Sequence, residues 1–292
     1  MPELPEVENV RRTLENLVTG KTIEDVRRTL ENLVTGKTIE DVIVTYPKIV
    51  KRPDDAEIFK EMLKGETIEN IKRRGKFLLL YVTNYVIVSH LRMEGKFLLH
   101  QEDEPIDKHT HVRFLFTDGT ELHYKDVRKF GTMHLFKKGE EMNQMPLADL
   151  GPEPFDAELT PQYLHERLQK TNRKIKVVLL DQRLLVGLGN IYVDEVLFRS
   201  QIHPEREASS LTAEEIERIY EATVTTLGEA VKRGGSTIRT YINSQGQIGS
   251  FQELLNVYGK KGEPCVTCGT ILEKTVVGGR GTHYCPICQP RI

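Results

Sequence analysis

The chain has 292 residues, with 41 basic against 43 acidic side chains and a formal net charge of -2. Hydrophobic residues make up 38% and charged residues 29%, so the chain can bury a substantial core, which excludes a disordered, collagen-like or coiled-coil protein. The length suggests about two domains. No stretch approaches the roughly 20 apolar residues that span a bilayer, and the first residues lack the features of a secretory signal. We therefore expect a soluble cytoplasmic protein, and the net charge alone argues weakly against a nucleic-acid partner.

A repeat is the first feature along the chain. Residues 10–25 recur without a change at 26–41. Repeat architectures normally need three or more copies, so two identical copies indicate a recent tandem duplication or an artefact. Each copy has apolar residues at helical spacing, then Thr-Gly as a helix stop, then the start of a strand. We expect the first helix to use the first copy, to about Val18, and the first strand to use the end of the second, while the surplus within 20–36 protrudes.

Short β-strands dominate the region from Val42 to Phe136. Alternating and apolar runs predict strands at 42–46, 77–82, 85–91, 96–100, 111–116, 121–126 and 132–136. The segment Thr117-Asp118-Gly119-Thr120 is a strong hairpin turn signal. Seven closely spaced strands with few helices favour a β-sandwich or barrel.

Helical periodicity follows the turn-forming segment 151–154. We expect helices at 161–170, 175–182, 191–199 and 213–233. Thr212 and Glu215 form a capping box at the start of the last helix, and Gly234 and Gly235 end it. This part of the chain is therefore predicted to be an all-α module.

Four cysteines lie near the C-terminus as two C-x2-C pairs separated by sixteen residues: Cys265, Cys268, Cys285 and Cys288. This spacing is typical of a four-thiolate zinc site, and four protein ligands leave no open position, so the metal is expected to be structural. Disulfides are disfavoured in a reducing cytoplasm. Residues 271–284 between the pairs predict a β-hairpin with a glycine-rich tip. Arg280 is the only charge at that tip, either a solvated turn residue or a donor for a phosphate or a base.

Basic residues gather in three regions, 72–76, 125–138 and 170–176. Each cluster singly is typical of a solvated face, but together with the hairpin they favour a groove that binds nucleic-acid phosphates. The glycine-rich segment 187–195 runs into a helix, whose N-terminus with Asn190 suits a phosphate, although an ordinary helix-turn-helix corner is the alternative.

Two further segments place a large apolar side chain beside an arginine before a glycine. They are His90 to Gly95, which contains Met93, and Asp126 to Gly131, which contains Arg128 and Phe130. Such apolar residues usually belong to a core. If exposed on a basic face, they would act as wedges between stacked bases.

The N-terminus carries a possible nucleophile. Removal of Met1 would leave Pro2 as a secondary amine, and an α-amino group, with a pKa of about 8, is more nucleophilic at neutral pH than lysine. Attack on a sugar C1′ would give an iminium, with Glu3 and Glu6 available for proton transfer. The alternative is that Pro2 and Pro5 only begin a helix, and on physical grounds alone this alternative is favoured.

Taken together, these segments resemble the bacterial formamidopyrimidine-DNA glycosylases over essentially the whole chain. The matching motifs are Pro2 to Glu8, Arg74-Gly75-Lys76, His90 to Gly95, Asp126 to Gly131, Gly187 to Glu195 and the four-cysteine hairpin with Gly279-Arg280-Gly281. The resemblance implies an α+β multidomain protein: a two-layer β-sandwich with flanking helices (1–150), a helix-two-turns-helix module (151–255) and a zinc-finger β-hairpin (256–292). It also implies one structural zinc ion, no organic cofactor and no membrane.

The same resemblance implies roles for individual residues. Pro2 would be the nucleophile, Glu3 would protonate the opening deoxyribose, and Lys76 would contact a phosphate near the lesion. The remaining roles are filling the space of the extruded nucleotide (Met93, Arg128, Phe130), gripping its flanking phosphates (Asn190, Arg280), and weaker backbone or structural support (His90, Lys174, Tyr192). The segment 240–251 would cover the damaged base. The implied partner is duplex DNA with an oxidised purine or abasic site, bound by a monomer associated with the nucleoid, and the implied reaction is base excision followed by β,δ-elimination.

Three alternatives remain open at this point. An endonuclease VIII-type enzyme would prefer oxidised pyrimidines, but its members typically begin Pro-Glu-Gly-Pro where this chain reads Pro2-Glu3-Leu4-Pro5. A DNA-binding zinc protein would lack the Pro2 chemistry altogether. A catalytically impaired product would follow if the second copy of the repeat displaced Pro2.

Overall fold

In the computed structural model, the described residues are 2–13, 34–101, 104–233, 235–236 and 251–291. The chain divides into two compact units. The first comprises Met1–Pro2, Glu6–Ala148 and Thr237–Gly249, and the second Glu3–Pro5, Asp149–Ser236 and Ser250–Ile292. None of the helices in the described ranges is long and apolar enough to cross a membrane. The boundaries at 150 and 255 stay predictions.

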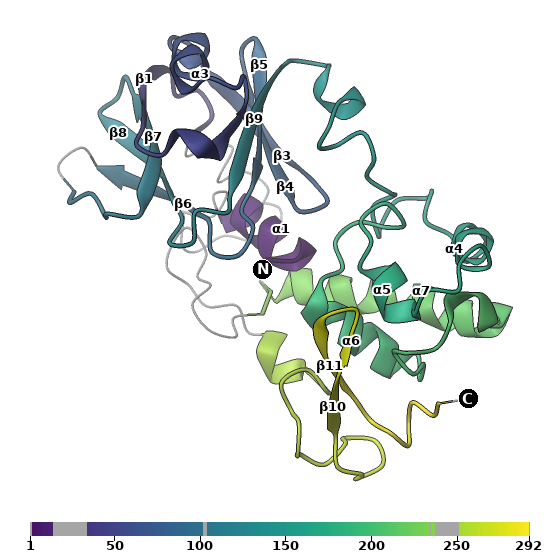
Figure 1. The fold of residues 1–292 in the computed structure, drawn as a ribbon. Coiled ribbons are helices and arrows are strands. Elements are labelled where there is room, and N and C mark those ends of the chain that lie inside the picture. Colours follow the sequence, from purple (N-terminus) through teal and green to yellow (C-terminus); the bar gives the residue numbers. More distant parts are fainter. Residues whose placement is uncertain (1, 14–33, 102–103, 234, 237–250, 292) are drawn as a thin grey trace. The chain divides into compact units, whose positions relative to one another are not determined.

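The first unit is built on two β-sheets (Figure 1). The four-stranded sheet has the order β1-β7-β8-β6, with β1 at Ile39–Val44, β6 at Lys96–Gln101, β7 at Thr110–Phe116 and β8 at Thr120–Lys125. The five-stranded sheet has the order β2-β9-β5-β4-β3, with β2 at Val50–Arg52, β3 at Ile68–Arg74, β4 at Phe77–Val82, β5 at Tyr85–His90 and β9 at Thr132–Lys137. One hydrophobic core draws residues from both sheets, so the sandwich prediction is confirmed.

Two strands and a helix of this unit were not predicted. Strands β2 and β3 are short or rich in charge, which hides their alternation. Helix α3 (Ala56–Leu63) begins at Asp55, whose side chain accepts the N–H of Glu57 at 2.7 Å, and it buries Phe59 and Leu63 in the sandwich core. The 3-10 turns of the unit are η2 (Pro47–Ile49) and η3 (Glu141–Asn143).

The two ends of the repeat join the fold as predicted, but residues 34–36, which were expected to belong to the protruding surplus within 20–36, are part of the fold instead. Helix α1 (Leu4–Thr13) takes its last residues from the first copy, and β1 takes its first residues from the end of the second. Val34, in the second copy, is fully buried in the sandwich core, and the N–H of Gly36 donates to the carbonyl of Ile68 at 2.7 Å. The expected helix end near Val18 and most of the expected insertion lie outside the described residues.

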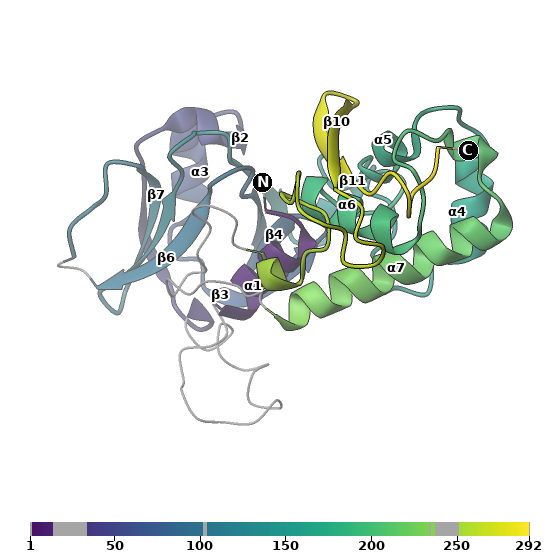
Figure 2. The ribbon, with the colours of Figure 1, turned by 90° about the horizontal axis from the view of Figure 1, so that it is seen from below.

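The second unit holds the helices and the cysteine hairpin. Its helices are α4 (Pro161–Leu168), α5 (Ile175–Leu179), α6 (Asn190–Arg199) and α7 (Ala213–Lys232), with 3-10 turns η4 (Ala208–Ser210) and η5 (Phe251–Leu254) and strands β10 (Glu273–Val277) and β11 (Arg280–Tyr284). The capping box of Thr212 and Glu215 is present at the start of α7. Figure 2 shows this long helix passing along α4 and α6, which share its hydrophobic core.

Candidate active site and nucleic-acid interface

The carboxylate of Glu3 binds the N-terminus of helix α6. Its oxygens accept N–H bonds from Gly189 at 2.7 Å, Ile191 at 2.7 Å and Tyr192 at 3.1 Å. The Glu3 residue is only 2% exposed. The first N–H groups of a helix have no intrahelical partner and carry partial positive charge, so they stabilise a carboxylate. The arrangement fixes the position of the Glu3 side chain.

Two glycines make room for this contact. A Cβ atom on Gly189 would lie 2.5 Å from both Cγ and Cδ of Glu3. Gly187 has a φ of +103°, and a Cβ there would lie 2.6 Å from a methyl carbon of Leu4. The N–H of Leu4 in turn donates to the carbonyl of Gly187 at 3.0 Å. Glycine is therefore required at both positions by close approach of the chain's own N-terminal residues.

The sequence favoured a phosphate at the amides of this helix N-terminus, and the structure places a carboxylate on three of them. Three of them bind Glu3 instead, because the distant N-terminus supplies an anion that no local pattern reveals. Asn190 has a different contact: its Nδ2 donates to the carbonyl of Gly281 at 2.9 Å, which joins α6 to β11.

Pro2 and Lys76 are both buried residues of the first unit. Lys76 follows Gly75, whose φ of +54° turns the chain from β3 into β4. Burial, with the charges of Arg92 and Lys76 adding to it, lowers the pKa of His90 to about 3. His90 is therefore a neutral imidazole at physiological pH, and its Nδ1 accepts the N–H of Arg92 at 2.9 Å.

The three predicted wedge residues are exposed. Met93 is 37% and Phe130 52% exposed, and Arg128 is exposed with its guanidinium 4.8 Å from the Phe130 ring centroid. Asp126 lies beneath them with no exposure and accepts the N–H groups of Arg128, Phe130 and Gly131 at 2.8–3.0 Å. The exposure that the wedge interpretation needs is thus present.

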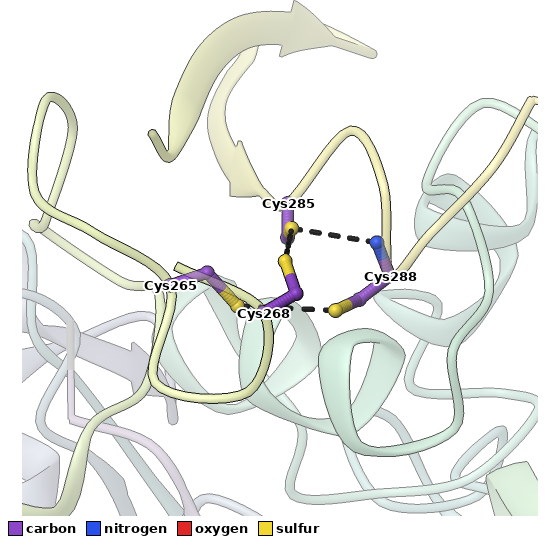
Figure 3. A group of neighbouring side chains, drawn as sticks. All are labelled: Cys265, Cys268, Cys285 and Cys288. Atoms are coloured by element: carbon purple, nitrogen blue, oxygen red, sulfur yellow. Dashed lines mark hydrogen bonds between the residues drawn. The ribbon is translucent and has the colours of Figure 1, made fainter. Parts of the chain in front are cut away.

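The four cysteines converge as the spacing predicts (Figure 3). All four Sγ atoms lie within 4.8 Å of one another, and the pairs Cys265–Cys288 and Cys268–Cys285 are 3.9 and 3.5 Å apart. A tetrahedral zinc with Zn–S bonds of about 2.3 Å requires sulfur separations of about 3.8 Å. The geometry therefore fits one structural zinc ion, held by two tight turns, in the first of which Gly269 has a φ of +74°.

A buried ion pair connects α5, α6 and the hairpin. The Nζ of Lys176, with no exposure, lies 2.7 Å from Oδ1 of Asp194 and donates to the Thr282 hydroxyl at 2.8 Å and the Gly281 carbonyl at 3.1 Å. The other Asp194 oxygen accepts the N–H of His283 at 2.9 Å. Arg280, at the start of β11, is exposed and forms no ion pair within the described ranges. Sequence reasoning missed this pair, because nothing distinguishes Lys176 from its solvated neighbours.

The basic segment 170–176 is not the free cluster that the sequence suggested. Arg173 pairs with Asp181, Lys174 with Glu205 and Lys176 with Asp194. The acids lie elsewhere in the sequence but adjacent in space, so the charge of the cluster is largely compensated.

Tyr192, a weaker candidate for backbone or structural support, is not exposed to solvent. The Tyr192 residue is 0% exposed, its hydroxyl is 3.1 Å from the hydroxyl of Ser236, and its ring packs 5.6 Å from that of Phe251. Its place in the helical core gives it a structural role. Most of the segment 240–251 lies outside the described residues, whereas Phe251 itself is buried.

The three family models that match this chain all describe parts of formamidopyrimidine-DNA glycosylases. Models of the formamidopyrimidine-DNA glycosylase N-terminal domain match residues 1–28 and 22–133, its H2TH domain matches 150–242, and a zinc finger found in FPG and IleRS matches 262–291. The N-terminal model matches residues 22–28 twice, as expected where one unit of the family pattern occurs in two copies.

Individual relatives agree along the full length. The chain is 94% identical over 292 residues to a formamidopyrimidine-DNA glycosylase of Bacillus anthracis and 57% identical over 291 residues to that of Bacillus subtilis, with all of each chain covered. The solved Lactococcus lactis Fpg in complex with abasic-site DNA is similar at 40% identity and a TM-score of 0.87, over 99% of this chain and 100% of that one. A mutant of the Lactococcus lactis Fpg, solved in complex with Fapy-dG containing DNA, is similar at 41% identity and a TM-score of 0.89, with the same coverage of both chains.

Proposed function

The chain belongs to the formamidopyrimidine-DNA glycosylase family, and we propose that it excises oxidised purines from duplex DNA through the amine of Pro2. It is a DNA glycosylase of base excision repair with a structural zinc ion, and cleavage of the resulting abasic site completes its reaction. The substrates are 8-oxoguanine and formamidopyrimidines. The catalytic roles are assigned from one observation. The carboxylate of Glu3, the residue that follows Pro2 in the sequence, is bound by three N–H groups at the N-terminus of α6.

The chemistry begins once Met1 is removed. The Pro2 nitrogen attacks C1′ of the damaged nucleotide, and the bond from C1′ to the base breaks, so that the base leaves with the electron pair and takes a proton from water. The proton of the Pro2 amine passes to Glu3 and from there to O4′ as the C1′–O4′ bond opens, leaving an iminium. Three N–H donors stabilise the ionised form of Glu3, so a proton taken from the Pro2 amine is readily passed on to O4′.

The exposed wedge residues would enter the DNA duplex. Met93, Arg128 and Phe130 fill the space of the extruded nucleotide, as base flipping requires. The phosphates would be gripped by Lys76, Asn190 and Arg280. Lys174 and Tyr192 are withdrawn from this set, because one is paired with Glu205 and the other is buried. The thiolates of the zinc site require reducing conditions, which supports action on chromosomal DNA in the cytoplasm. The enzyme would act as a monomer.

Borohydride trapping tests the proposal. Reduction of the iminium should link the protein covalently to a duplex that contains 8-oxoguanine or an abasic site. The matched control carries one extra residue before Pro2, which converts the amine into an amide and should abolish trapping while DNA binding persists. Absence of an adduct with the unaltered chain, or an undiminished adduct with the extended one, would refute the role of Pro2. Excision of oxidised pyrimidines in preference to 8-oxoguanine would favour the endonuclease VIII alternative.

A further inference from the structure

Two loops of the first unit run side by side from one sheet to the other. The β5–β6 loop (residues 91–95) carries Met93, and the β8–β9 loop (residues 126–131) carries Arg128 and Phe130. The strands that flank them are paired at both ends, with His90 opposite Thr132 and Lys96 opposite Lys125. The two loops therefore start and finish as neighbours, and their separation sets the relation between the wedge residues.

The ring of Tyr124 lies between these loops. Tyr124 is fully buried near the end of β8, and its hydroxyl oxygen would be 2.2 Å from a Cβ on Gly95 and 1.8 Å from a Cβ on Gly131. Distances this short mean that the hydroxyl already touches the backbone of both glycines. Phe97 packs edge-on against the ring, with centroids 5.0 Å apart. The phenol is thus clamped in place and bears on both loops at once.

The hydroxyl makes no hydrogen bond that would explain its presence. It has no partner in the described part of the chain, whereas a buried tyrosine hydroxyl usually has one. Leaving such a group unpaired destabilises the folded state. Burial and the charge of Asp126 raise the pKa of Tyr124, so the group stays protonated. A phenylalanine would avoid this cost, and the contribution of the hydroxyl must therefore be its volume.

Each loop is internally rigid. Asp126 binds three N–H groups of the β8–β9 loop, and the Gly95 N–H donates to the carbonyl of Leu91 at 2.9 Å in the other. Arg92 and Lys129 have φ angles of +54° and +58°, a conformation that a non-glycine residue keeps only where its surroundings enforce it. With both loops fixed internally, their mutual spacing is the variable that Tyr124 controls.

We propose that Tyr124 is a positioning residue whose hydroxyl sets the spacing of the two loops and so aligns Met93 with Arg128 and Phe130 for insertion at the flipped nucleotide. This inference rests on the proposed function. Small errors of placement are costly in such sites, since a shift of about 1 Å can reduce a rate about 100-fold. Tyr124 itself, being buried, does not touch the DNA.

The test compares two reactions of the full-length zinc-loaded protein under single-turnover conditions. Excision of 8-oxoguanine requires the enzyme to extrude a paired base, whereas a preformed abasic site has no base to extrude and depends less on the wedge. Tyr124→Phe should slow excision about tenfold and change abasic-site cleavage less than about twofold, with thermal stability equal to or above that of the unaltered chain. Gly131→Ala, which pushes against the same hydroxyl, should show the same asymmetry with a larger loss.

Leu122→Ala is the matched control, because Leu122 lies two residues earlier in β8 and is also fully buried. It should lower thermal stability and leave the ratio of the two rates unchanged at a temperature where the protein is folded. An unchanged ratio in Tyr124→Phe, equal loss of both activities, or the same asymmetry in Leu122→Ala would each overturn the inference. Failure of the unaltered chain to excise 8-oxoguanine would instead overturn the proposed function.

Discussion

In both units a glycine makes room for a buried side chain, but one of these side chains is a charged carboxylate and the other carries a neutral hydroxyl. In the second unit, Gly189 admits Glu3, whose carboxylate has three N–H donors. In the first, Gly95 and Gly131 admit Tyr124, whose hydroxyl has no partner in the described ranges. A charge must be solvated by the protein, and a neutral ring need only fill space. The glycine in the second unit therefore fixes the position of the Glu3 charge, and the glycines in the first unit fix the distance between the two loops that flank Tyr124.

Removal of charge compensation in the second unit should give the largest effect. Asp194→Ala leaves the buried ammonium of Lys176 without its partner, and such a loss costs about 3–5 kcal/mol. Urea denaturation of the zinc-loaded protein measures it. The control is Arg183→Ala, which removes an exposed pair with Asp181 and should cost less than about 1 kcal/mol. Equal effects of the two substitutions would mean that burial of the Lys176 pair is unimportant.

A methyl group at residue 189 should be the next most damaging change. Gly189→Ala forces Glu3 off the amides of α6, so we expect both base excision and abasic-site cleavage to fall about 100-fold. This equal loss contrasts with the asymmetry expected for Tyr124→Phe. Gly228→Ala in α7 is the control, because among the described residues its Cβ would approach only Phe155, at 3.8 Å, and single-turnover rates should not change. Normal rates in Gly189→Ala would show that the position of Glu3 is not critical.

Local patterns predicted the elements well and the long-range contacts poorly. The strands around Phe77–Val82 and the capped helix after Thr212 follow from periodicity and turn chemistry, which are properties of neighbouring residues. The cysteine cluster also follows, because two short spacings specify it. The wedge residues were identified by motif, but their exposure could only come from the structure.

Two charged contacts could not be foreseen, and they share a physical cause. The N–H groups at the start of α6, where the sequence favoured a phosphate, bind Glu3, and Lys174, a weaker candidate for backbone or structural support, pairs with Glu205. In both cases the partner comes from a distant part of the sequence, and a charged group satisfied at long range looks the same in sequence as a free one. The role of Tyr124 was missed for the same reason, since its two glycines lie in different loops.

Acidification should destabilise the first unit through His90. Its folded-state pKa of about 3 lies below the unfolded value of about 6.5, so the unfolded chain binds the proton first and stability falls as the pH drops from 6.5 towards 3. The loss from this group is at most about 1.4 kcal/mol per pH unit. His90→Asn keeps an acceptor for the Arg92 N–H and cannot be protonated. Urea denaturation between pH 7 and pH 5 should therefore show a shallower decline for this variant, and parallel declines would exclude His90 as the source.

Removal of the second copy of the repeat should have the smallest effect. Both ends of the duplicated segment join the fold, at α1 and at β1. A longer loop costs little entropy, about 0.6 kcal/mol for each doubling of its length. Deletion of residues 26–41 should therefore change trapping and excision less than about twofold and raise stability by less than about 1 kcal/mol. A large gain in activity on deletion would mean that the second copy competes with the first for the place of α1. The comparison of the two glycine sites would then apply only to the shortened chain.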